Sequence, residues 1–201
     1  MKLYSMPSSG NSYKVRLLLA LLGRAVEIVD VEDNSAEIQR AKSDGMLPFG
    51  KAPVLMLDDG RLLPESNAIL GFLGEGTAFV PADPFARATM NGWMFWEQNQ
   101  HEGTVAVRAA LLNYAHRRHL ATPERLADLL ERGHANLQIM ETRLQAHDWL
   151  AADAVSLADI CLYGYTHSAG SRGGFDMARF PGINRWIERI ASLPGYKGLS
   201  E

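Results

Sequence analysis

Polar side chains gather at two places in the first half of the chain where a helix is expected to begin. Residues 8–12 supply three serine hydroxyls and the carboxamide of Asn11 directly before an apolar helical pattern. Glu65 and Ser66 precede a second such pattern, which contains Ile69. The first backbone N–H groups of a helix have no intrahelical partner, so an anion is stabilised beside them. The start of this second helix is therefore a candidate for holding the anionic end of a small ligand, and residues 8–12 offer further hydrogen-bond donors.

An extended backbone edge is predicted next to that second helix start. Residues 54–57 form a short apolar run typical of a strand, and Pro53 at its entrance cannot donate to a ladder. The strand must begin there or lie at an edge, which leaves the backbone of Ala52 able to pair with something else. The Asp-Gly turn at Gly60 predicts a hairpin, after which Ser66 can cap the helix. A small peptide with a carboxylate end fits both features, as an added strand and as an anion at the helix start.

The elements around these residues are predicted to alternate between strands and helices. Val15, Leu18 and Leu22 repeat at helical spacing, and either Asn11 or Ser12 can cap that helix. The β-branched run that follows predicts a second strand, parallel to the first because a helix connects them. The predicted order β-α-β-α-β-β-α comprises strands at residues 2–5, 26–31, 54–57 and 62–63, with helices before Gly23, over residues 35–44 and after Ser66.

Chain-breaking residues concentrate at positions 74–84, which places a domain boundary there. The predicted domains are residues 1–77, with mixed strands and helices, and residues 84–201, which are entirely helical. Two helix starts in the second domain have a capping residue followed by proline, at residues 83–84 and 122–123.

Aromatic residues at helical spacing in the second domain are more often core than ligand site. We therefore expect Trp93 and Trp96 to be core, and His101 and Arg108 to lie on a solvated surface. The single cysteine, Cys161, lies in an apolar run and is predicted to be a buried structural thiol.

Composition narrows the class of protein. The chain has 201 residues, 47% of them apolar, and a net charge of −3, which gives no general basic field for nucleic acid. No apolar run approaches the roughly 20 residues of a membrane span, and the first residues lack a signal-peptide pattern, so we expect a cytoplasmic protein. His116 and His119 lie among arginines, so no metal site is predicted.

Several motifs resemble the glutathione transferase superfamily over nearly the whole chain. Pro53 before the third strand and the pair Glu65-Ser66 at the start of the third helix are similar to the most specific marks of that family, with one hairpin between them. The capping box formed by Ser156 and Asp159 is similar to that of the family's second domain. The resemblance implies an α/β thioredoxin-like domain followed by an all-α domain, in agreement with the predicted order of elements.

The resemblance also implies which residues hold glutathione. The backbone of Ala52, before the cis proline that the family has at Pro53, is expected to pair with the cysteinyl unit of glutathione. Glu65 and Ser66 are expected to hold the γ-glutamyl end, and Lys51 is expected to help. Alternatively, Glu65 and Ser66 only complement the dipole and cap of their helix.

The thiol-activating residues are assigned by the same resemblance. With the sequences aligned on residues 15–16, Ser9 matches the serine of zeta-like members and the threonine of nu-like members, and Asn11 matches the nu-class asparagine. We therefore expect the Ser9 hydroxyl to donate to the glutathione thiolate, with Asn11 as a second donor. Ser8 and Ser12 remain competitors, and Ser9 and Asn11 could instead only shape the turn and cap the helix.

The function implied is a glutathione transferase that brings glutathione, as co-substrate, to a small hydrophobic electrophile. Tyrosine-type members place their tyrosine where this chain has Ser5, so Tyr4 is predicted to lie in the core or an interface, and no cysteine occupies the first loop. Alternatives are a non-catalytic binding or scaffolding protein and a glutathione-dependent peroxidase or isomerase. The family also implies a homodimer, with no nucleic acid or membrane partner.

Overall fold

The structure, a computed structural model, describes residues 1–200, which form two compact units. The first unit contains residues 1–77 together with the segment that starts at Ala191, and the second contains residues 78–190. The predicted second domain includes that final segment, whereas its contacts lie in the first unit. The predicted domain ranges stay a prediction, because a division by contacts does not test which parts fold independently.

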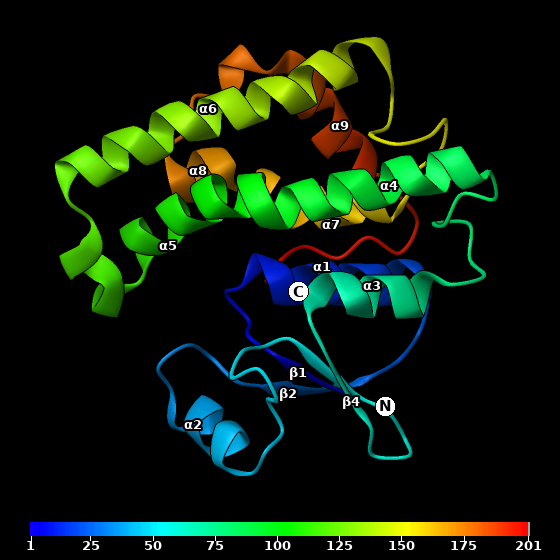
Figure 1. The fold of residues 1–201 in the computed structure, drawn as a ribbon, viewed down its shortest axis with the longest axis vertical. Helices are drawn as coiled ribbons and strands as arrows, with labels where there is room; N and C mark the ends of the chain where they lie inside the picture. Colours follow the sequence, from blue (N-terminus) through cyan, green and yellow to red (C-terminus); the bar gives the residue numbers. More distant parts are fainter. Residues whose placement is uncertain (201) are drawn as a thin grey trace. The chain divides into compact units, whose positions relative to one another are not determined.

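The first unit is built on a four-stranded mixed sheet with the strand order β2-β1-β3-β4. β1 and β2 pair in parallel, whereas β3 is antiparallel to both of its neighbours. In Figure 1, α1 and α3 cover one face of the sheet and α2 covers the other. This is the predicted thioredoxin-like arrangement. Its elements are β1 (Lys2–Ser5), α1 (Gly10–Leu21), β2 (Glu27–Asp30), α2 (Ala36–Ser43), β3 (Val54–Met56), β4 (Leu62–Pro64) and α3 (Ser66–Gly74).

The start of α1 differs from the prediction. Its N-cap is Ser9, and neither Asn11 nor Ser12 takes that position, because the helical backbone already begins at Gly10. The predicted end is confirmed: Gly23 has φ +62, and the N–H of Arg24 donates to a carbonyl of the last helical turn. The helix therefore starts inside the serine-rich loop, so that the polar side chains of this loop lie around its first turn.

Tyr4 packs as predicted. Together with Val29 and Leu62 it contacts a buried cluster that includes Val31 and Val54, on the α2 side of the sheet. Because side chains alternate across a strand, the next residue along β1 points to the opposite face, towards α1.

The second unit is a bundle of helices around α7, in which every residue except Tyr165 is buried. Figure 1 shows α4, η1 and α5 as one continuous rod beside α6. Both predicted helix starts are confirmed, because Asp83 and Thr122 each accept a hydrogen bond from a backbone N–H of the first turn. The elements are α4 (Pro84–Trp96), the π-helix η1 (Glu97–Ala106), α5 (Val107–Asn113), the 3₁₀ helix η2 (Ala115–Leu120), α6 (Pro123–Ala146), α7 (Leu157–Thr166), α8 (Ala169–Gly173), the 3₁₀ helix η3 (Met177–Arg179) and α9 (Pro181–Ala191).

Two buried carboxylates organise the helix starts of this bundle. Asp159 completes the predicted capping box with Ser156, and it also accepts hydrogen bonds from the backbone of Leu150 and the indole of Trp186. Glu141 of α6 accepts hydrogen bonds from the first backbone N–H groups of α9. Each carboxylate lies at a helix N-terminus, where its charge is stabilised by the helix dipole. Among residues 1–200, no helix has both the length and the apolar composition that crossing a membrane requires.

Candidate active site

Ser9 lies at the N-terminus of α1 without using its hydroxyl to cap the helix. Its backbone is extended, with φ −88° and ψ 129°, and its side chain forms no capping hydrogen bond. The backbone holds the residue in place, since its N–H donates to the carbonyl of Met6 at 3.1 Å and its carbonyl accepts from the N–H of Tyr13 at 2.9 Å. Ser9 is half-buried at the start of the helix. Serine is a preferred N-cap because its oxygen normally accepts from the first turn, and this arrangement departs from that use.

Ser8 and Ser12, the two alternatives to Ser9, form hydrogen bonds that hold the loop in place. Ser8 donates through its hydroxyl to one oxygen of Glu32 at 2.6 Å and through its backbone N–H to the other at 3.1 Å. Ser12 is fully buried, and its hydroxyl oxygen accepts from the N–H of Met6 at 2.9 Å. These contacts fix the path of the chain on both sides of Ser9.

Asn11 connects the starts of α1 and α3. Its side-chain oxygen accepts a hydrogen bond from the Lys14 ammonium at 2.7 Å and another from the Ser66 hydroxyl at 3.1 Å. Because an ammonium group only donates, these contacts fix which end of the carboxamide faces Lys14 and Ser66. The structure therefore brings together a predicted catalytic residue and a predicted glutathione-binding residue.

Ser66 was predicted to cap α3, but it does not occupy the N-cap position. Glu65 is the N-cap and Ser66 is the first helical residue, so the Ser66 hydroxyl, 4% exposed, points to Asn11 instead. Glu65 has φ 72° and ψ 116°, a conformation that L residues other than glycine rarely adopt. Such backbone costs about 1 to 3 kcal/mol, and residues that retain it cluster at functional sites. The side chain of Glu65 is exposed at this position and makes no capping hydrogen bond.

The predicted backbone edge lies at the entrance of β3. The peptide bond between Ala52 and Pro53 is cis, and the strand begins at Val54. The backbone of Ala52 thus lies outside the ladders that β3 forms with β1 and β4. Lys51 precedes it on the loop with an exposed side chain, and within the part of the chain that the structure describes it takes part in no ion pair.

Two charged residues of α1 that sequence reasoning missed surround this loop. Lys14 is fully buried beside Asn11. Arg16 donates to the hydroxyl of Ser5 at 2.8 Å and to the carbonyl of Pro7 at 3.1 Å. Burial lowers the pKa of the Arg16 guanidinium, and the nearby carboxylates of β2 and the following loop oppose that shift. A signal for Lys14 was present in the sequence, because it lies four residues before the buried Leu18 on the same helical stripe.

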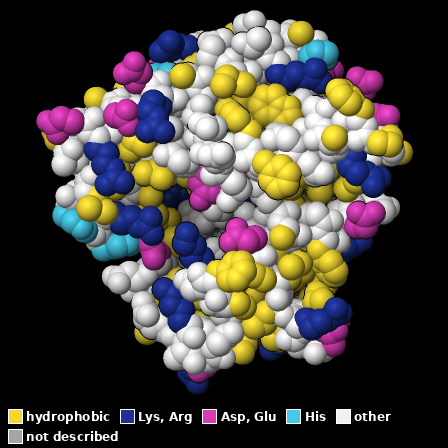
Figure 2. Space-filling view, viewed as in Figure 1, with side chains coloured by type: hydrophobic (Ala, Val, Ile, Leu, Met, Phe, Trp, Pro, Cys, Tyr) yellow, Lys and Arg dark blue, Asp and Glu magenta, His cyan; other side chains and the backbone are white. Residues whose placement is uncertain are grey.

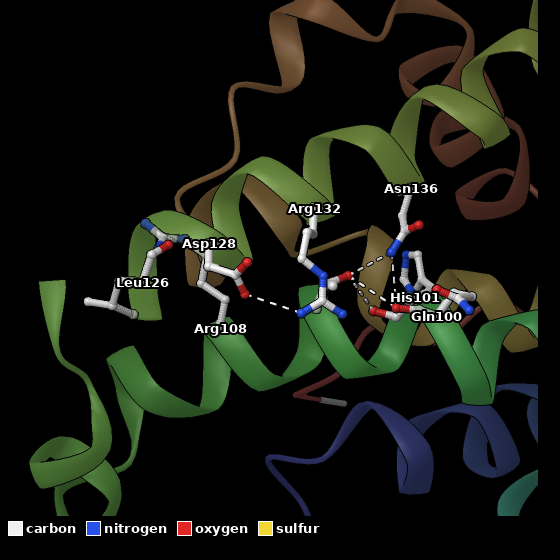
Figure 3. Close-up of polar contacts among 8 residues, drawn as sticks. Gln100, His101, Arg108, Leu126, Asp128, Arg132 and Asn136 are labelled. Atoms are coloured by element: carbon white, nitrogen blue, oxygen red, sulfur yellow. Dashed lines mark hydrogen bonds and ion pairs between the residues drawn. The ribbon is translucent and has the colours of Figure 1, made fainter. Parts of the chain in front are cut away.

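The second unit contains a row of polar side chains that includes His101, whose burial contradicts its predicted solvated position, and Arg108, which is half-buried. His101 is fully buried, with its Nε2 3.0 Å from the hydroxyl of Thr166. Figure 3 shows Asn136 of α6 pointing towards Gln100 and His101 of η1, and its amide donates to the carbonyl of Gln100 at 3.0 Å. Arg108 donates to backbone carbonyls of α8 and α6, at 2.7 Å to the first of them, and burial lowers its pKa.

The π-helix explains why His101 is not on a solvated surface. A helix with i→i+5 hydrogen bonds turns less per residue than an α-helix, so a 3.6-residue pattern assigns its residues to the wrong face. Trp93 and Trp96, predicted as core, are only half-buried and form an edge-to-face pair with ring centroids 5.3 Å apart. Cys161 is buried as predicted and lies 3.3 Å from a carboxylate oxygen of Glu97. Within residues 1–200 no group of three or more histidine, cysteine and acidic side chains could hold a metal ion.

Comparison with known proteins identifies the class to which this fold and site belong. Residues 3–77 match the family model of the glutathione S-transferase N-terminal domain, and residues 104–194 match that of the glutathione S-transferase C-terminal domain. The chain therefore belongs to the glutathione S-transferase family.

Particular relatives are similar over nearly their whole length. A glutathione S-transferase structure from Pseudomonas fluorescens has 39% identity and a TM-score of 0.93, with 100% of this chain and 98% of that one covered. The structure of a possible glutathione S-transferase from Rhodopseudomonas palustris has 42% identity, the same TM-score and the same coverage. Among curated proteins, the disulfide-bond oxidoreductase YfcG of Escherichia coli is 28% identical over 96% of this chain and 90% of its own length.

Proposed function

We propose that this protein is a glutathione transferase that activates the glutathione thiol for attack on a small hydrophobic electrophile. The observation that carries the proposal is the hydrogen bond from Ser66 to Asn11, because it joins the two groups of residues that the reaction needs. The start of α3 holds the peptide, and the start of α1 acts on its sulfur. The thiolate sulfur forms a bond to carbon of the electrophile, which either loses a leaving group or gains a proton at an activated double bond, and the thiol proton goes to solvent.

The peptide-binding half of the site consists of Ala52, Pro53, Glu65 and Ser66, with Lys51 beside them. The backbone of Ala52 lies outside the ladders of β3 and pairs with the cysteinyl unit as an added strand. At the start of α3 the γ-glutamyl carboxylate meets backbone N–H groups and the Ser66 hydroxyl. The strained backbone of Glu65 supports a ligand role, since a residue that only began a helix would gain nothing from φ 72°.

The chemical half consists of Ser9 and Asn11. A cysteine thiol has a pKa near 8.5, and lowering this value by about two units requires about 2.7 kcal/mol of preferential stabilisation of the thiolate. A hydroxyl donor from Ser9, a second donor from Asn11 and the N-terminus of α1 each contribute to that amount. The buried Lys14 Nζ donates to the Asn11 side-chain oxygen at 2.7 Å and so holds the carboxamide in place.

Two other functions within the same family are alternatives. Relatives include the disulfide-bond oxidoreductase named above and a maleylacetoacetate isomerase from Pseudomonas aeruginosa, 27% identical. A glutathione thiolate held by Ser9 would also support peroxidase or isomerase chemistry, whereas exchange through an enzyme thiol is disfavoured because the cysteine of this chain is buried. A non-catalytic binding or scaffolding role is the remaining alternative.

We further propose a nu- or zeta-like, cytoplasmic, homodimeric protein that acts in detoxification. Large aromatic side chains are exposed in both units, with Phe72 51% exposed in the first and Phe85 and Phe95 81% and 75% exposed in the second. Figure 2 shows apolar side chains, coloured yellow, gathered into clusters on the visible face. Exposed aromatic groups of this size are typical of a surface that another chain covers.

The experiment that tests the proposal compares two N-cap serines of the same unit. Calorimetry measures glutathione binding, and turnover is measured with a chromogenic aryl halide. Ser9→Ala is expected to lower turnover about 100-fold, since removal of one donor to a developing anion commonly has an effect of this size, while affinity for glutathione changes less than about threefold. Ser35→Ala is the matched control, because Ser35 caps α2 through its side chain at 3.2 Å, so its loss should lower stability by about 1 kcal/mol and leave turnover unchanged.

Three results would contradict the proposal. Absence of glutathione binding in the wild-type protein would favour the non-catalytic alternative. Binding without turnover of any electrophile would exclude a transferase. Unchanged turnover in Ser9→Ala would exclude the assigned role of that hydroxyl.

A further inference from the structure

The guanidinium of Arg16 connects three segments of the first unit that are distant in sequence. It donates to Ser5 at the end of β1, at 2.8 Å, and to the carbonyls of Met6 and Pro7, at 3.5 and 3.1 Å. Among the residues that the structure describes, its remaining hydrogen bond is to the carbonyl of Leu199, to which Nη2 donates at 3.0 Å. A guanidinium is planar and presents its five donors in a fixed fork, so movement of one acceptor changes the geometry offered to the others.

The segment around Leu199 is docked along α1 by contacts of its own. The Tyr13 hydroxyl donates to the carbonyl of Lys197 at 2.8 Å. Gly195 has φ +85, and a Cβ atom there would lie 2.9 Å from the backbone oxygen of Ala20. Only glycine permits this close approach to the helix. In Figure 1 the segment after α9, coloured red, runs along α1.

The loop before Ser9 is held from its other side by Glu32. The two oxygens of this carboxylate accept from the hydroxyl and the backbone N–H of Ser8. Arg16 and Glu32 thus hold consecutive parts of one loop through opposite charges. Within the loop, the N–H of Ser9 donates to the carbonyl of Met6, one of the groups that Arg16 contacts. The direction of the Ser9 hydroxyl therefore depends on where Arg16 holds the backbone before it.

We propose that Arg16 is a positioning residue that couples the docked segment 195–200 to the loop that aims the Ser9 hydroxyl at the glutathione sulfur. The inference rests on the proposed function of Ser9 and extends it to a control over that function. When the segment leaves α1, Arg16 loses the Leu199 carbonyl and shifts towards water, and the loop loses its support at Met6 and Pro7. Thiolate stabilisation then weakens, although none of the groups that hold the peptide has moved.

The first measurement is the pKa of the thiol of bound glutathione, followed by the ultraviolet absorption of the thiolate in a pH titration. We expect Arg16→Met to raise this pKa by about one unit, which corresponds to a tenfold smaller thiolate fraction below the pKa, with affinity for glutathione within about threefold of wild type. Two further variants should raise the thiol pKa by a smaller amount. One is a chain ending at Lys197, which lacks Leu199, and the other is Tyr13→Phe, which keeps the aromatic ring.

The matched control is Arg24→Met. Arg24, which follows the end of α1, also donates to a backbone carbonyl, that of Leu73 at 3.0 Å, and among the residues that the structure describes it forms no hydrogen bond with the loop. This variant should lose stability and keep the wild-type thiol pKa. If the role of Arg16 is purely structural, both arginine variants should lose stability and keep the wild-type thiol pKa. That result would overturn the proposal.

A second measurement does not depend on glutathione. Hydrogen exchange of the Ser9 amide in the ligand-free protein should accelerate about tenfold in Arg16→Met and in the chain ending at Lys197, and the double variant should exchange no faster than Arg16→Met alone. An unchanged rate in the shortened chain and in Tyr13→Phe would overturn the coupling. If the wild-type protein fails to bind glutathione, the proposed function fails, and this measurement still decides whether the segment controls the loop.

Discussion

Replacement of Asp159 tests how far one buried carboxylate stabilises the helical unit. Its two oxygens accept four hydrogen bonds, from the N–H of Leu150 at 3.0 Å, the indole of Trp186 at 3.0 Å, and the N–H and hydroxyl of Ser156 at 2.8 and 2.9 Å. The three residues that donate are fully buried. In Asp159→Ala the Ser156 hydroxyl can rotate to another acceptor, but the other three donors cannot.

The expected loss follows from those three donors. A buried donor left without a partner costs about 1 to 3 kcal/mol, so Asp159→Ala should lose about 3 to 9 kcal/mol. A domain is stable by only about 5 to 15 kcal/mol, and the variant is therefore expected to be largely unfolded or strongly destabilised. Asp159→Asn retains one acceptor oxygen for Leu150 and Trp186 and presents an amide to Ser156, so about 2 to 4 kcal/mol should be lost.

Urea denaturation followed by circular dichroism measures both variants. The midpoint should fall while the slope with urea stays the same, since the buried surface is unchanged. Ser156→Ala, which removes only the hydroxyl, serves as the control and should lose about 1 kcal/mol. If Asp159→Ala and Asp159→Asn are both within about 0.5 kcal/mol of wild type, the carboxylate does not stabilise the bundle and the reasoning is wrong.

Three further predictions concern separate parts of the molecule. Burial lowers the pKa of His167 in the folded state, so its contribution to stability is present at neutral pH and is lost as the pH falls through the folded-state pKa. The variant His167→Gln should therefore show a smaller fall in thermal stability between about pH 7 and 5. If the variant loses as much thermal stability over this range as the wild-type protein, His167 is not the cause of the fall. Glu65→Gly should leave stability within about 1 kcal/mol of wild type, because relief of backbone strain offsets the greater freedom of the unfolded chain. Calorimetry should nevertheless show at least a tenfold loss of glutathione affinity in this variant. Gly133→Ala should lower the free energy of unfolding measured in urea by about 1 to 3 kcal/mol, since its Cβ would lie 2.4 Å from the Phe175 ring. The control Gly92→Ala, at an exposed position, should leave this free energy unchanged or raise it. Equal changes in the two variants would show that the ring moves freely.

Local patterns in the sequence predicted most of the fold because its elements obey local rules. The strands, the hairpin, both proline helix starts and the capping box at Ser156 depend on residues that are close in sequence. Their energies are set by turn chemistry and capping, which do not depend on the rest of the chain.

The site was only partly predictable, because its supporting contacts join distant residues. Asn11 and Ser66 could be named as candidates, but the hydrogen bond between them depends on how α1 and α3 pack. The roles of Arg16 and Glu32 were missed for the same reason, since each binds backbone or hydroxyl groups of another segment. A charged residue is normally assigned to water, and nothing local indicated that these two hold a loop.

The π-helical segment from Glu97 to Ala106 has a consequence for comparisons between this chain and its relatives. Hydrogen bonds from i to i+5 enclose one residue more than those from i to i+4, so the segment holds surplus length that a regular α-helix would not. A relative that lacked one residue here could keep α4 and α5 in place by converting the segment to α geometry. Alignments should therefore tolerate a single gap between residues 97 and 106, and an ungapped comparison with such a relative would mismatch every position on one side of the missing residue.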